Sequence, residues 1–182
     1  MTQSAVLGTA PETVDGLLRE YETMQNVALC AYALGTLASG FHQAAPSQES
    51  GLTLWHMFSA LPLVLHDISR KMISTKRVGS GLRSILNRDI IVNVGQNEVI
   101  MNLPKRMRDM RRRTMRALNC AIAWDLLVIT DGVFVTGPRF AWPRQVEGET
   151  GEILKAAEKL GKWAAGCSTF EYLTVLGIDP TR

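Results

Sequence analysis

The sequence predicts a mainly α-helical protein with a small β-hairpin, in which a winged-helix-like core carries N- and C-terminal helical extensions. Apolar residues recur at helical spacing over most of the chain. Asp131-Gly132, between two short alternating segments, is typical of a tight hairpin turn. Apolar residues make up 46% of the 182 residues, enough for one core. We therefore expect a flexible N-terminus over residues 1–12 and a single mostly helical domain over residues 13–182, with the winged-helix-like part at about 78–137.

The first helical pattern runs from Thr13 to Phe41. Asn26 can break or cap it, which would give a short helix followed by a longer one. Small side chains let another backbone approach closely, so we place this longer helix at the centre of the core. Its small residues are Ala28, Cys30, Ala31, Ala33, Gly35, Ala38 and Gly40.

Leu52 to Met72 is predicted to be a second buried helical segment. Pro62 lies inside it, and proline removes a backbone donor, so a kink or a new helix is expected there. Residues 78–88 follow as a shorter amphipathic helix. The packing residues expected in the second segment are Leu54, Trp55, Phe58, Leu61, Val64, Leu65 and Ile68.

Residues 90–103 fit two structures. Ile90–Val94 and Val99–Met101 flank Gly95-Gln96-Asn97, which suits a hairpin. The same residues also suit the end of one helix and the start of another. The apolar spacing does not choose between them.

The second half predicts two helices, a hairpin and two further helices. A basic helix buries Leu103, Met107 and Met110, and Thr114 caps or begins the next helix. Strands at Leu126–Thr130 and Val133–Thr136 follow, and this order of helix, helix and hairpin resembles a winged helix. Glycines end the last two helices, at Gly166 and Gly177. Buried positions expected after Thr114 are Met115, Leu118 and Ile122, and the last helices are Glu152–Ala165 and Thr169–Leu176.

Charge is unevenly placed along the chain. Between Lys76 and Arg116 there are eleven Lys or Arg residues against three acids, whereas the rest of the chain holds nine against fourteen. Such a distribution favours an acidic partner on one face of the protein.

The densest charged feature is a basic segment on the predicted helix. Arginine forks suit phosphate oxygens or protein carboxylates, so the segment is a candidate contact for a partner protein or for a DNA backbone. A solvated helix face without a partner is the third interpretation, and a partner protein is the one we favour. The candidate residues are Lys105, Arg106, Arg108, Arg111, Arg112, Arg113 and Arg116.

Base-specific DNA reading fits this sequence poorly. The candidate recognition helix, Thr114–Trp124, offers Arg116 and Asn119 but otherwise mainly alanines and bulky apolar residues. The hairpin tip carries Asp131, which phosphate would repel. A winged-helix DNA-binding transcriptional regulator is therefore the alternative function rather than the first.

No enzymatic motif is found, so we expect a protein that is not an enzyme and has no cofactor or metal. His42, His56 and His66 have no i,i+4 partner and lie far from the cysteines. The three cysteines are odd in number and lie in apolar stretches, typical of thiols in a reducing compartment. The apolar run Val27–Ala38 is too short for a bilayer, so the expected location is the cytoplasm, with no membrane contact.

Several stretches, in order along the chain, resemble the middle component of three-component ABC systems, the family that includes the accessory subunit of Lamassu-type anti-phage defence. Departures from the family pattern occur at Pro104, Asp125 and Asp179. The similar stretches are Asn26–Leu29 through Ser39–Phe41, Leu61–His66, Ser74–Arg77 with Leu82–Ser84, Thr114–Leu127, Lys159–Trp163 and Leu176–Pro180.

This resemblance implies a non-catalytic adaptor for antiviral defence. Such a subunit would join an SMC- or Rad50-like ATPase to an effector, often a nuclease, and help to hold the effector inactive until invading DNA is sensed. The family offers no catalytic residues to carry over.

Overall fold

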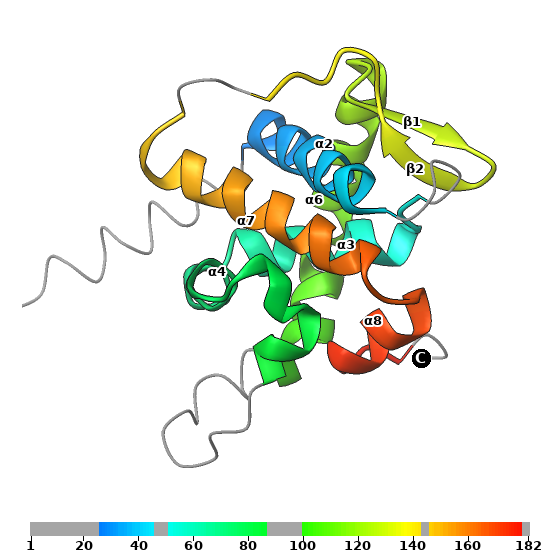
Figure 1. Cartoon of the computed structure of the whole chain (residues 1–182). Helices are drawn as coiled ribbons and strands as arrows, with labels where there is room; N and C mark the ends of the chain where they lie inside the picture. Colours follow the sequence, from blue (N-terminus) through cyan, green and yellow to red (C-terminus); the bar gives the residue numbers. More distant parts are fainter. Residues whose placement is uncertain (1–25, 46–50, 87–99, 143–145, 180–182) are drawn as a thin grey trace, which may run out of the picture.

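Figure 1 shows a helical body with one β-hairpin at its edge, in a computed structural model that describes residues 26–45, 51–86, 100–142 and 146–179. The predictions for residues 1–25, and for 90–99, lie outside these described residues. The mainly α-helical fold with a small hairpin is confirmed. None of the described helices is both long and apolar enough to cross a membrane. The helices are α2 (Val27–Ala44), α3 (Leu54–Val64), α4 (Asp67–Thr75), α6 (Leu103–Ala123), α7 (Gly148–Ala165) and α8 (Thr169–Val175).

The centre of the fold is the close pair α2 and α7, which lie side by side in Figure 1. A Cβ atom at Gly40 would lie 2.2 Å from the Glu158 carbonyl oxygen, and one at Gly161 would lie 2.1 Å from that of Leu37. The two backbones therefore touch, and only glycine fits at both positions. This confirms the prediction that the helix rich in small residues is central. Asn26 caps it, because its Oδ1 accepts a hydrogen bond from the Leu29 N–H at 2.9 Å.

The predicted hairpin is confirmed as β1 (Leu127–Thr130) and β2 (Val133–Thr136). Asp131 and Gly132 both have positive φ, 51° and 80°, as a type I′ turn requires. The strands pair antiparallel, with Ile129 opposite Phe134. On its other side β2 is bridged by Leu52, which exchanges two backbone hydrogen bonds with Phe134.

Two predicted helices in the first half are corrected. The segment Leu52–Met72 is divided into α3 and α4, and the break falls at Leu65-His66 rather than at Pro62. His66 has extended backbone and its ring accepts the Ser69 N–H, so a new helix is capped there. Residues 78–86 form two 3₁₀ turns, η1 (Val78–Ser80) and η2 (Leu82–Leu86), because Gly81 between them has a φ of 68°.

Some of the predicted burial is also corrected. Leu54, Trp55 and Ile68 are exposed, because α3 and α4 turn other side chains inward. The inward side chains of α3 include Met57 and Leu61, as well as the polar His56 and Ser59.

The most consequential correction concerns Thr114. No helix begins there, because α6 continues unbroken through Thr114, which is buried in the middle of it. The pair of helices that we expected before the hairpin is therefore one helix, and a winged-helix arrangement is not confirmed. Residues 100–101 are helical, which agrees with the helical alternative for that part of residues 90–103.

Candidate functional site

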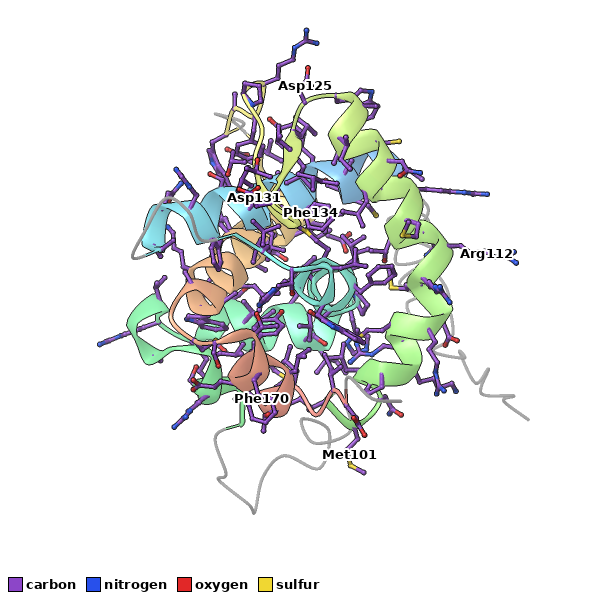
Figure 2. All side chains as sticks on the ribbon, turned by 90° about the vertical axis from the view of Figure 1, so that its right-hand side faces the viewer. Met101, Arg112, Asp125, Asp131, Phe134 and Phe170 are labelled. Atoms are coloured by element: carbon purple, nitrogen blue, oxygen red, sulfur yellow. The ribbon has the colours of Figure 1, made fainter. Side chains whose placement is uncertain are left out.

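The candidate site is the outer face of α6. The helix starts with Pro104 in its first turn, where a missing N–H costs nothing, and runs unbroken to Ala123. It buries one face against α2 and α3, and Figure 2 shows its other face turned away from the body. The buried residues recur every three or four positions: Leu103, Met107, Met110, Thr114, Ala117, Leu118 and Ala121.

Five of the seven predicted basic residues are exposed on α6. Arg108, Arg112 and Arg116 follow one another at four-residue intervals, so they form a stripe along the helix. Arg112 points outward in Figure 2. The exposed basic residues extend from Lys105 to Arg116, which is about 16 Å along the helix at a rise of about 1.5 Å per residue. We call the five exposed residues the α6 cationic face: Lys105, Arg108, Arg111, Arg112 and Arg116.

The other two predicted residues are turned toward the body. Arg106 is partly buried, and its Nη1 donates to the Pro62 carbonyl oxygen and to Ser69 Oγ, both at 3.2 Å. Arg113 is partly buried near Cys30 of α2, where its charge opposes the effect of burial on the thiol pKa. The structure thus places Arg106 and Arg113 in packing positions.

Within the described part of the chain, the α6 cationic face forms no ion pair. Asp109 is the only acidic residue of α6, and it is exposed among six arginines and a lysine. Like charges four residues apart, such as Arg108 and Arg112, each cost a helix about 0.2–0.5 kcal/mol. The α6 cationic face therefore does not stabilise this fold, and an external anion would relieve its repulsion.

Several cations elsewhere in the body have acidic or carbonyl partners. Arg70 is buried and pairs with Asp67 and Glu149 at 3.2 and 3.0 Å. Lys159 donates to three carbonyl oxygens at the end of α4, at 2.8–3.1 Å, and burial lowers its pKa. Both residues line a hollow of about 550 Å³, so much of its charge is already neutralised.

Met115 is the residue of this site that the sequence prediction missed. It was expected to be buried, yet 42% of it is exposed beside the arginines. Counting the apolar period from Leu103 instead of from Thr114 places Met115 on the outer face, between Arg111 and Arg112 on one side and Asn119 on the other. Exposed methionine and arginine together are typical of protein interfaces.

His56 and Cys30, two residues that could carry chemistry, are buried in the core. His56 Nδ1 accepts the Thr53 N–H at 3.0 Å, and its ring packs against Tyr172. Burial lowers the pKa of His56 to about 4 and raises that of Cys30 to about 11. Among the residues that the structure describes, no group of His, Cys, Asp and Glu could hold a metal ion.

Fold and site together describe a mainly helical protein in which one helix exposes a row of basic side chains. Residues 14–180 match the family model described as ABC-three component (ABC-3C) system Middle Component 3. The chain belongs to this family, as the ordered resemblance of its sequence predicted. No match was found among curated proteins or among solved structures.

Proposed function

We propose that this chain is a non-catalytic adaptor that joins an SMC- or Rad50-like ATPase subunit to an effector nuclease subunit, in a cytoplasmic anti-phage defence complex of the Lamassu type. Membership of the middle-component family supports a role among partner subunits. The α6 cationic face carries the proposal, because it is exposed and lacks an ion-pair partner among the described residues.

The partner at the α6 cationic face is proposed to be an acidic protein surface. Guanidinium groups bind carboxylates through two parallel hydrogen bonds, and four of the five residues of the face are arginine. Met115 adds exposed apolar area within the face, and exposed Trp124 lies one residue beyond the end of α6. A duplex backbone needs positive charge but gains little from methionine, so the composition favours protein over DNA.

The test is co-purification of the three components expressed together. Arg112→Glu with Arg116→Glu reverses two of the five charges of the face, and we expect it to remove at least one partner from the complex. The matched control is Arg77→Glu with Lys155→Glu, which makes the same charge change at two exposed residues outside α6. If both double variants assemble like the wild type, the α6 cationic face is only solvated. If the wild-type chain binds neither partner, the adaptor role itself is wrong.

The alternative, a winged-helix transcriptional regulator, makes an opposite prediction. The isolated chain would then bind one discrete operator sequence, and its affinity would fall steeply as salt increases. A gel-shift assay with DNA from its own gene cluster separates the two functions.

A further inference from the structure

The outer edge of β1 is a second place where this chain can take a partner. In the described sheet the order is β1-β2, and Leu52 occupies the far side of β2. Among the residues that the structure describes, no strand lies beside the outer side of β1. Residues 128–130 are exposed, carry no charge and contain no proline, so the edge lacks the charged and proline residues that often block strand pairing.

The hydrogen-bond pattern shows which backbone groups face outward. Phe134 donates to Leu52 at 2.7 Å and accepts from it at 3.0 Å, so both of its backbone groups point away from β1. Ile129 is opposite Phe134, and in an antiparallel ladder their pair must then be a non-hydrogen-bonded one. The N–H and C=O of Ile129 consequently point to the open edge. Gly137 N–H bonds to Leu126 C=O, which agrees with this alternation.

The side chains at this edge are also accessible. Ile129 is 53% exposed and Val128 is 36% exposed. The open edge is short, because Leu127 is buried at one end and the turn residue Asp131 closes the other. An added strand could thus make two backbone hydrogen bonds to Ile129 and apolar contacts on either side of it.

We infer that an extended segment from another component of the same system adds to β1 as a strand, with an apolar residue opposite Ile129 and a basic residue near Asp131. A second copy of this chain is a poor occupant. Two copies paired through residues 128–130 would bury only a few hundred Å², against about 1,200 Å² for a stable interface. A short strand binds well when the same partner is already held elsewhere, because tethering raises its effective concentration. The inference therefore rests on the proposed function.

The direct test is hydrogen exchange of the Ile129 amide in the isolated chain and in the complex of three co-expressed components. We expect fast exchange in the isolated chain and exchange slowed by at least about 100-fold in the complex. The Val128 amide is the internal control, since Val128 belongs to a hydrogen-bonded pair within the hairpin and stays slow in both samples.

The possible outcomes separate this inference from the adaptor role. A complex in which Ile129 still exchanges fast overturns the strand addition and leaves the adaptor role standing. An isolated chain that dimerises with a slow Ile129 amide also overturns it, because the occupant is then a second copy. No complex at all overturns both proposals.

A pair of variants tests the backbone contact. Ile129→Pro removes an N–H that the hairpin does not use, so the hairpin survives, as shown by a slow Val128 amide. Ile129→Val keeps the N–H and most of the side chain. We expect Ile129→Pro to weaken binding to the other two components, purified together, by about 10-fold relative to Ile129→Val. Equal affinities of the two variants would overturn the inference.

Discussion

Gly161→Ala tests whether the contact between the α2 and α7 backbones organises the core. The new Cβ would lie 2.1 Å from the Leu37 carbonyl oxygen and 2.8 Å from the Phe41 nitrogen. Both are backbone atoms of α2, so no side chain can rotate out of the way. The helices must separate by about an ångström, and a gap of that size forfeits a quarter to a half of the dispersion energy of the facing atoms.

The expected cost follows from two opposing terms. Overpacking of this kind costs about 1–3 kcal/mol, and a backbone clash belongs near the upper end. Alanine in place of glycine within a helix returns about 1 kcal/mol. We therefore expect the free energy of unfolding to fall by about 2 kcal/mol. For a chain of this size the midpoint temperature would fall by about 4–8 °C.

Urea denaturation followed by circular dichroism measures this loss. The control is Gly79→Ala, because a Cβ at Gly79 meets nothing within 4 Å and its φ is not positive. That variant should stay within about 0.5 kcal/mol of the wild type. If Gly161→Ala is as stable as Gly79→Ala, the two backbones do not touch as described and the central helix pair must be reconsidered.

Two further predictions concern polar side chains that contact the backbone of a neighbouring turn or helix. His56 is buried and its pKa is lowered from 6.5 to about 4, so the unfolded chain takes up a proton that the folded chain refuses. Stability should therefore decline by about 3 kcal/mol as pH falls from 6.5 to 4. Urea titrations should show a shallower decline for His56→Gln, and equal slopes would mean that another group is responsible. Lys159→Met leaves three carbonyl oxygens at the end of α4 without their donor, and should lower the free energy of unfolding by about 2–3 kcal/mol. The control is Lys155→Met, at an exposed position of α7, the helix that also carries Lys159. This variant should change the free energy of unfolding little. Similar losses in the two variants would contradict the capping role of Lys159.

The elements with strong local signals could be predicted from the sequence. The spacing of small residues indicated that α2 is central, and Asp131-Gly132 indicated the hairpin turn. Thr114 misled the prediction because threonine is a good cap, yet nothing before it breaks the helix. That wrong boundary also placed Met115 in the core. The apolar spacing of one segment does not show whether the next segment continues the same helix.

The tertiary contacts of the site could not be predicted in this way. Arg106 resembles its basic neighbours in sequence, but its guanidinium bonds to Pro62 and Ser69, which are distant in the chain. Similarly, the bridge from Leu52 to Phe134, which determines the open edge of β1, joins residues more than eighty positions apart. Only these tertiary contacts show that Arg106 does not belong to the α6 cationic face.

Two arginines from other helices bond to the C-terminal end of α3, and this arrangement has a mechanical consequence. Arg106 of α6 bonds to the Pro62 carbonyl oxygen, and Arg70 of α4 bonds to those of Val64 and Leu65. Three helices thus share one joint, built from the carbonyl groups that the last turn of a helix leaves unpaired. Load applied to α6 by a bound subunit would pass through Arg106 into this joint and from there to α4. A displacement of α6 would therefore also be felt by α3 and α4.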